Sequence, residues 1–308
     1  MSVLDRRQLL AALMALPIVA TPAPAAARQM PKIKAYHTRV IRGGGAQPVV
    51  GIGTSRRYND PVGEEQLVPL RQTLARFVEL GGRVIDTAPS YGRAESVVGQ
   101  LMAELKLRDK LFIATKVGVD SREAGVAQIE QSFKNLRTNY IDLIAVHNIR
   151  DVDNQLAILR DLQKATRVGA VGITTSTDTQ YTDFEAIMRR HPLDTIQVDY
   201  ALDNRNAAER ILPLAQEKNI VAMINLPFGR ARLFDLTRGK PLPDWAAEIG
   251  AASWAQVFLK YVLSHPSRPI AIPGTAQPKY ADDNLAAAKG PLPDAALRKR
   301  MEAYIDAL

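Results

Sequence analysis

The sequence predicts an α/β protein with a (β/α)8 barrel, and three observations support this fold class. Short apolar segments rich in Val and Ile recur eight times along the chain. Segments with helical spacing of apolar residues separate them, as at Leu67, Leu70, Leu74 and Phe77. Eight strands alternating strictly with helices favour parallel pairing and closure into a TIM barrel. A doubly wound open sheet is the competing fold, but no Gly-x-Gly-x-x-Gly turn opens a helix.

The predicted strands bound a single domain. In chain order they are residues 49–53, 83–87, 111–117, 141–147, 170–174, 195–200, 220–226 and 270–273. Residues 32–48 precede the first strand, and we expect them to form a hairpin that caps the bottom of the barrel. Neither an internal repeat nor a composition shift marks a second domain, so residues 28–308 are predicted to form one barrel domain.

Composition excludes several classes of function. The 308 residues carry a formal net charge of +8, but the basic residues are scattered and form no stripe interleaved with aromatics. We interpret them as a solvated surface, with no nucleic-acid partner. The absence of cysteine excludes disulfides, thiol nucleophiles and thiolate metal sites, and no metal site is predicted. Of the four histidines, His37, His191 and His265 are predicted to lie at the surface.

The N-terminus has the pattern of an export signal. Arg6 and Arg7 precede an apolar run at residues 9–20, and small residues follow it. The run is too short for stable membrane insertion. The paired arginines resemble the twin-arginine signal that exports folded proteins, although a general secretory signal is the alternative. The sequence therefore predicts a signal peptide at residues 1–27, cleaved after Ala27 or alternatively after Ala25. The export machinery would be a partner, and the mature protein would be periplasmic.

Polar side chains follow the predicted strands at the points where their apolar runs stop. Asp86 ends the second strand and Tyr91 lies in the loop after it. Lys116 ends the third strand, His147 the fourth and Gln197 the sixth. The active sites of (β/α)8 barrels lie at the carboxyl ends of the strands. We therefore expect these side chains to project toward one mouth.

Four of these groups suit one kind of chemistry. A tyrosine, with a reference pKa near 10, needs help to donate a proton at neutral pH. An ammonium group such as Lys116 stabilises a phenolate, and a carboxylate such as Asp86 keeps the lysine charged. An imidazole such as His147 can orient a carbonyl oxygen. The set would protonate a carbonyl oxygen while a nicotinamide cofactor delivers hydride.

The order Asp86, Tyr91, Lys116 and His147 resembles the catalytic tetrad of the aldo-keto reductase family. The resemblance extends from residue 49 to residue 284. It implies a barrel that binds NADP(H) across its mouth, with Tyr91 as general acid/base in the interconversion of a carbonyl and an alcohol. Each residue alone also has a structural explanation: Asp86 and Lys116 as a buried ion pair, Tyr91 as a loop residue and His147 as a core histidine.

The same resemblance implies a set of cofactor-binding residues. They come from the turn after the first strand and from the ends of later strands. They are Gly53, Thr54, Ser55, Asp86, Thr174, Thr175, Gln197, Asn225, Leu226, Pro227, Gly229, Arg230, Gly274, Thr275, Tyr280, Asp283 and Asn284.

Several of these positions depart from the family pattern. Thr174 and Thr175 stand where the family usually has Ser and Asn, so one amide is lost. Asn225 stands where many members have a tyrosine that stacks on the nicotinamide ring. Gly274 and Tyr280 stand where NADP-selective members have Lys and Arg, although Lys279 could supply a charge. NADP is the expected cofactor, and NAD is the alternative.

Two classes of function remain open. The first is an oxidoreductase acting on a small carbonyl or alcohol substrate. The second is a slow-turnover nucleotide-binding sensor or accessory module of a periplasmic system. The complete tetrad favours the enzyme, and the missing stacking tyrosine favours the module.

Overall fold

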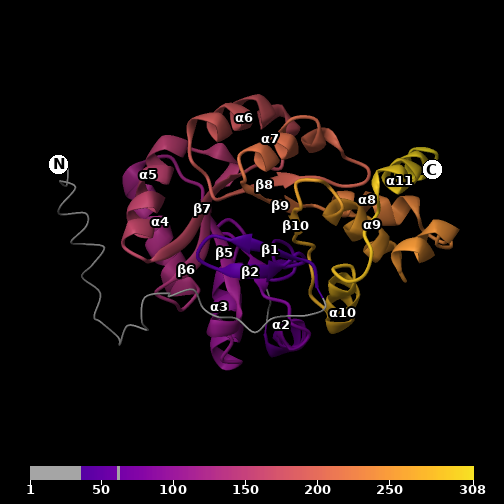
Figure 1. The fold of residues 1–308 in the computed structure, drawn as a ribbon. Helices are drawn as coiled ribbons and strands as arrows, with labels where there is room; N and C mark the ends of the chain where they lie inside the picture. Colours follow the sequence, from indigo (N-terminus) through magenta and orange to yellow (C-terminus); the bar gives the residue numbers. More distant parts are fainter. Residues whose placement is uncertain (1–35, 61–62) are drawn as a thin grey trace.

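A computed structural model describes residues 36–60 and 63–308 of the chain. Its central sheet has eight parallel strands, each overlapping one predicted strand (Figure 1). Neighbours in the sheet follow one another in the chain, from β3 to β10. The strands are β3 (Ile52–Gly53), β4 (Val84–Asp86), β5 (Phe112–Val117), β6 (Ile141–Val146), β7 (Val168–Thr174), β8 (Thr195–Asp199), β9 (Val221–Asn225) and β10 (Ile270–Ala271).

The sheet closes on itself. Parallel bridges join Val50 to Ala271 and Gly53 to Gly274, so the last strand returns to the first. Backbone hydrogen bonds carry this junction, including Gly51 N to Ala271 O at 2.8 Å and Gly53 N to Pro273 O at 3.0 Å. The predicted (β/α)8 barrel is confirmed, and the open sheet is excluded.

Helices surround the barrel (Figure 1). They are α2 (Glu64–Glu79), α3 (Ala94–Glu104), α4 (Arg122–Asn135), α5 (Val152–Lys164), α6 (Tyr181–Arg190), α7 (Ile211–Glu217), α8 (Arg232–Leu236), α9 (Trp254–Leu263), α10 (Pro278–Ala286) and α11 (Ala295–Asp306). Within residues 36–60 and 63–308, none of the helices is long and apolar enough to cross a bilayer. The predicted signal peptide and its cleavage site lie outside the described residues.

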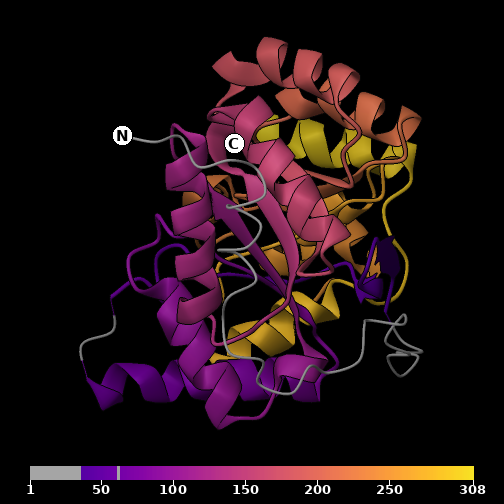
Figure 2. The same ribbon diagram turned by 90° about the vertical axis from the view of Figure 1, so that its left-hand side faces the viewer.

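A hairpin caps the bottom of the barrel, as predicted. Strand β1 (Thr38–Ile41) pairs antiparallel with β2 (Gly45–Pro48). Figure 1 shows the hairpin across the ring of strands, and the side view in Figure 2 places it at one end of the barrel. Ile41 is buried and packs in one cluster with barrel residues such as Phe112, Leu143 and Met223. The hairpin therefore closes the end at which the strands begin.

Both faces of the strands are covered. All six residues of β5 and all six of β6 are buried, because side chains alternate between the barrel interior and the helix layer. These strands consequently read as continuous apolar runs, and a polar residue within or directly after such a run stands out. Lys116 in β5 and His147 after β6 are two such residues.

Candidate active site

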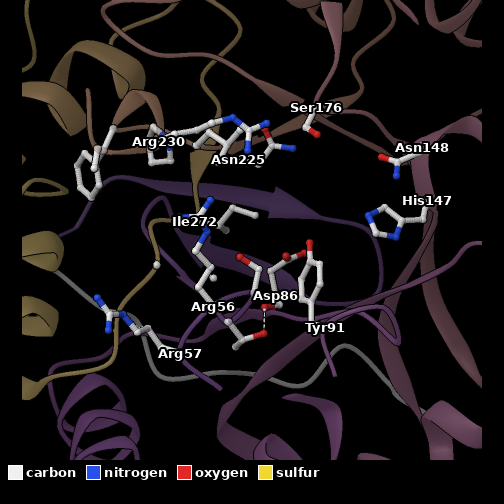
Figure 3. Close-up of a pocket in the computed structure, with 18 residues that line it drawn as sticks. Arg56, Arg57, Asp86, Tyr91, His147, Asn148, Ser176, Asn225, Arg230 and Ile272 are labelled. Atoms are coloured by element: carbon white, nitrogen blue, oxygen red, sulfur yellow. Dashed lines mark hydrogen bonds between the residues drawn. The ribbon is translucent and has the colours of Figure 1, made fainter. Parts of the chain in front are cut away.

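A pocket of about 420 Å³ opens at the carboxyl ends of the strands. Asp86, Tyr91 and His147 line it (Figure 3). Asp86 is the last residue of β4, and His147 begins the short 3-10 turn after β6. Lys116 is buried and contacts Asp86 from the neighbouring strand β5. The structure therefore brings together all four residues of the predicted tetrad.

A buried ion pair joins Asp86 to Lys116. Lys116 Nζ lies 2.9 and 2.8 Å from the two carboxylate oxygens, and it donates a third hydrogen bond to Thr87 O at 2.9 Å. Burial opposes both charges: it raises the pKa of Asp86 and by itself would lower that of Lys116. Attraction to Asp86 and Tyr91 outweighs burial at the lysine, so the pKa of Lys116 is raised. Lys116 is therefore charged at neutral pH.

Tyr91 lies against this ammonium group. Lys116 Nζ is 5.0 Å from the centroid of the Tyr91 ring. The loop that carries Tyr91 is fixed by Tyr91 N donating to Ala88 O at 3.0 Å and by Arg93 N donating to Asn59 O at 2.7 Å. Gly92 has φ +56°, and a Cβ there would lie 2.6 Å from Asn59 O. Glycine is therefore required for the close packing that holds the phenol at the mouth.

His147 completes the site as a neutral imidazole. Its ring meets the Tyr91 ring edge to face, with centroids 6.1 Å apart. Burial, together with the charge of Lys116, lowers the pKa of His147 to about 4. Ser90 Oγ lies 3.4 Å from Nδ1. A neutral imidazole has one N–H, which can donate to a carbonyl oxygen in the pocket.

Gln197 reaches the same carboxylate from across the barrel. Its Nε2 donates to Asp86 Oδ1 at 3.1 Å, so three strands converge on Asp86. Thr54, at the end of β3, bonds the backbone of the same residue, with Oγ1 2.9 Å from Asp86 O. In the described residues no group of three His, Asp or Glu side chains could hold a metal ion. The mouth of the barrel thus brings together a phenol, an ammonium group, a carboxylate and an imidazole, a set of groups that suits acid–base chemistry.

A family model with the description "Aldo/keto reductase family" matches residues 49–305. This chain belongs to the aldo/keto reductase family. The matched region contains every strand of the barrel and every residue of the site described above. Reductases are also among the relatives of this chain, and these matches cover most of both chains. The chain is therefore an oxidoreductase.

Individual relatives agree with the family assignment. Aldo-keto reductase YhdN of Bacillus subtilis is 31% identical over 168 residues, which cover 50% of this chain and 50% of the relative. Methylglyoxal reductase YeaE of Escherichia coli is 28% identical over 268 residues, covering 83% of this chain and 91% of the relative. A crystal structure of an aldo/keto reductase from Klebsiella pneumoniae, in complex with NADP and acetate, has a TM-score of 0.76 and 25% identity. That match covers 87% of this chain and 95% of the Klebsiella chain.

The residues that the aldo/keto reductase resemblance implied for cofactor binding fall into three groups. The first lines the pocket beside the tetrad: Gly53, Thr54, Ser55, Asp86, Asn225, Leu226, Pro227, Arg230 and Gly274. The second is buried and lies outside the pocket lining: Thr174, Thr175, Gln197, Gly229, Thr275 and Asn284. The third lies on α10, like Asn284, but is less buried: Tyr280, which is 48% exposed, and Asp283.

Asp283 is engaged away from the pocket. Its carboxylate accepts hydrogen bonds from Ser253 Oγ at 2.9 and 2.8 Å and from Gln256 Nε2 at 2.6 Å. These partners belong to the start of α9, so Asp283 ties α10 to α9. Asn284 instead donates to Thr275 Oγ1 at 3.0 Å and fixes the loop after β10.

Several pocket residues were not predicted. They are Arg56, Arg57, Asn148, Ser176, Phe228, Ala231 and Ile272. Most of them directly follow or adjoin a predicted site residue at a strand end. A prediction that also included the first two residues of the loop after each strand would have contained several of these pocket residues.

The prediction that His265 lies at the surface is wrong. The residue is 8% exposed, and its ring packs edge to face on Tyr200 with centroids 5.5 Å apart. Arg298 of helix α11 reaches into the same region and donates to the Tyr200 hydroxyl at 2.6 Å. Helix α11 therefore covers the turn after α9. The contact joins segments far apart in the chain, so the sequence around His265 does not predict it. His37 is exposed and His191 is partly exposed.

Proposed function

We propose that the chain is an NADP(H)-dependent reductase of aldehydes or ketones in which Tyr91 is the general acid. One observation carries the proposal: the Tyr91 ring lies against an ammonium group that a buried carboxylate holds in place. A proton donor of this kind needs its anionic form stabilised at the moment of transfer. Lys116 supplies that stabilisation, and Asp86 keeps Lys116 charged and oriented.

The pocket fits a dinucleotide. Among the described residues, the buried Asn225 Oδ1 has no hydrogen-bond partner, although its Nδ2 donates to Thr175 O at 3.2 Å. A Cβ added at Gly274 would meet no atom of residues 36–60 and 63–308 within 4 Å, so this part of the structure leaves space open where the first and last strands meet. Arg56, Arg57 and Arg230 line the same pocket and offer positive charge to phosphates. A relative's crystal structure in complex with NADP also supports this cofactor.

Bound NADPH would supply hydride to the carbonyl carbon. Tyr91 transfers its hydroxyl proton to the carbonyl oxygen, which becomes the alcohol, and the resulting phenolate is stabilised by Lys116. His147, neutral because its pKa is about 4, donates an N–H to the same oxygen and orients it. In the reverse direction the Tyr91 phenolate accepts the alcohol proton. Asp86, which accepts a hydrogen bond from Gln197, holds Lys116 in position throughout.

Steady-state reduction of a panel of aldehydes and ketones with NADPH tests the proposal. Methylglyoxal belongs in the panel because one relative is named a methylglyoxal reductase. We expect turnover that falls by about 10²–10⁴ in Tyr91→Phe, the range for general acid–base catalysis. NADPH binding, measured by fluorescence, should remain. Unchanged turnover in Tyr91→Phe would assign the proton transfer to another group.

One feature favours a second function, that of a slow-turnover nucleotide-binding module. Asn225 offers an amide and no aromatic face at the position where the family resemblance leads one to expect a stacking tyrosine. Nucleotide binding without turnover on the whole panel would support the module.

We also propose that the protein is exported to the periplasm. Arg6 and Arg7 before an apolar run support a twin-arginine signal. This route carries folded proteins, so the cofactor would be loaded before translocation. The barrel would then cross the membrane with its nucleotide bound. The enzyme would need to carry the nucleotide because soluble nicotinamide cofactor is scarce outside the cytoplasm.

A further inference from the structure

We propose that Arg57 recognises the 2′-phosphate of NADP(H) and makes the enzyme selective for NADP(H) over NAD(H). The inference rests on the proposed function, because it concerns the cofactor of that site. The charge would come from the loop after the first barrel strand. The positions after the last strand, where the family resemblance places Lys and Arg, carry no charge.

Neither of those two positions supplies positive charge. Gly274 has no side chain, and a Cβ added there would have no described residue within 4 Å. Tyr280 is 48% exposed and uncharged. Lys279 Nζ lies 4.9 Å from the centroid of the Tyr280 ring, so this ammonium group already rests on its neighbour. Neither Gly274 nor Tyr280 therefore supplies a charge to a 2′-phosphate near them, so the cation is either Lys279 or a residue of another element.

The loop after β3 is fixed beside Gly274. Gly53 forms a parallel bridge with Gly274, and Gly53 N donates to Pro273 O at 3.0 Å. Tyr58 is fully buried, and its hydroxyl donates to Thr275 O at 3.3 Å. Arg57 lies between these two anchors in the chain. Its backbone is therefore held next to the loop after β10.

The Arg57 side chain is available for an anion. It is exposed and lines the pocket, and within residues 36–60 and 63–308 it has no carboxylate partner. Asp86 is the one carboxylate among the described residues that line the pocket, and Lys116 neutralises it. The pocket thus has unbalanced positive charge, which favours a ligand with several negative charges.

The position of Arg57 favours the phosphate farthest from the reacting carbon. In Figure 3, Arg56 points into the middle of the pocket, and Arg57 lies on the far side of Arg56 from Tyr91 and His147. The nicotinamide must lie against Tyr91 to deliver hydride to a carbonyl there. A dinucleotide extended away from Tyr91 would pass Arg56 first, so Arg57 meets its adenosine end. That end carries the group that distinguishes NADP from NAD.

Nucleotide binding to the purified full chain, without substrate, tests the inference. NADPH and NADH would be titrated separately and followed by nucleotide fluorescence. We expect Arg57→Gln to raise the Kd for NADPH on the order of 10- to 100-fold, the range for one charge-assisted contact. The Kd for NADH should change less than twofold. Lys164→Gln, which removes one charge from the exposed side of α5, should leave both unchanged.

A second-site variant sharpens the test. Because space around Gly274 is open, Gly274→Lys should restore NADPH affinity in the Arg57→Gln background and leave NADH affinity unchanged. Circular dichroism would verify that each variant is folded. Restoration would show that Arg57 and the side chain at position 274 serve the same phosphate.

Two results would overturn the inference while leaving the proposed function intact. An equal loss of NADPH and NADH affinity in Arg57→Gln would place this side chain on the pyrophosphate. An unchanged Arg57→Gln, with selective loss in Lys279→Gln, would assign the 2′-phosphate to Lys279. A wild-type protein that binds neither nucleotide would instead overturn the proposed function together with this inference.

Discussion

Lys116 and Asp86 form an ion pair at 2.8 Å in which the two side chains are only 2% and 7% exposed. Two charges buried to this degree are stable only while both are present, because either one alone would be an uncompensated charge in the interior. The same lysine faces the Tyr91 ring. The pair therefore couples the stability of the barrel mouth to its chemistry, and the two contributions can be separated.

Lys116→Met removes the charge beside Tyr91 and leaves Asp86 unpaired. We expect a rate loss of about 10²–10⁴. We also expect a stability loss of about 3–5 kcal/mol, measured by urea unfolding, with the fold retained. Combining Lys116→Met with Asp86→Asn should recover much of the lost free energy of unfolding and none of the lost catalytic rate. Near-normal activity in Lys116→Met would refute the role assigned to the tetrad.

The pH dependence of catalysis should show that His147 works as a neutral donor. Because its pKa is lowered to about 4, it stays uncharged from pH 5.5 to 7. We expect kcat/KM to show no acid limb near pH 6.5, the ordinary pKa of histidine. The profile would be compared with that of His147→Gln. A limb near pH 6.5 that disappears in this variant would contradict the neutral state.

His265 should make folding stability depend on pH. Burial, with a smaller effect from Arg298, lowers its pKa to about 4, whereas the unfolded chain has a pKa near 6.5. Between these values the unfolded state binds a proton that the native state does not, so stability falls as pH decreases from 6.5 to 4. His265→Gln should reduce the loss of stability between pH 7 and pH 4.5. An identical loss in both proteins would show that His265 titrates normally.

Tyr280→Arg tests whether α10 lies near the adenosine phosphate. The new guanidinium should tighten NADPH binding much more than NADH binding. The gain should be on the order of 1.5–3 kcal/mol for a charge-assisted phosphate contact. Tyr280→Phe is the control, since it removes only the hydroxyl. Equal effects of Tyr280→Arg on the two nucleotides would place α10 away from the 2′-phosphate.

Export is tested at the N-terminus. Replacing Arg6 and Arg7 with lysines should trap the precursor in the cytoplasm if the signal is of the twin-arginine type. Redirecting the mature chain through a general secretory signal should give folded, nucleotide-free protein in the periplasm. Mass spectrometry would compare the nucleotide bound to the native and redirected proteins. Equal nucleotide content in the two would refute loading before export.

Much of the barrel follows from local sequence. Each strand is a short apolar run bounded by helical segments, and the strands of a parallel barrel all end at one mouth. A polar residue such as Asp86 or His147 at the end of such a run is therefore assigned to the mouth from its position alone. This geometric rule is why the meeting of these side chains at one mouth could be predicted without knowing a single contact.

Contacts between distant loops had to come from the tertiary structure. Gln197 reaches Asp86 across 111 positions of chain, and Gly53 lies beside Gly274 because barrel closure joins the first strand to the last. His265 is buried because the C-terminal helix covers it, and Asp283 turns to α9 because Ser253 and Gln256 meet it there. Local sequence determines where a strand or helix begins and ends. Contacts between particular charged side chains depend on packing between elements far apart in the chain. The residue pattern within one segment contains no information about that packing.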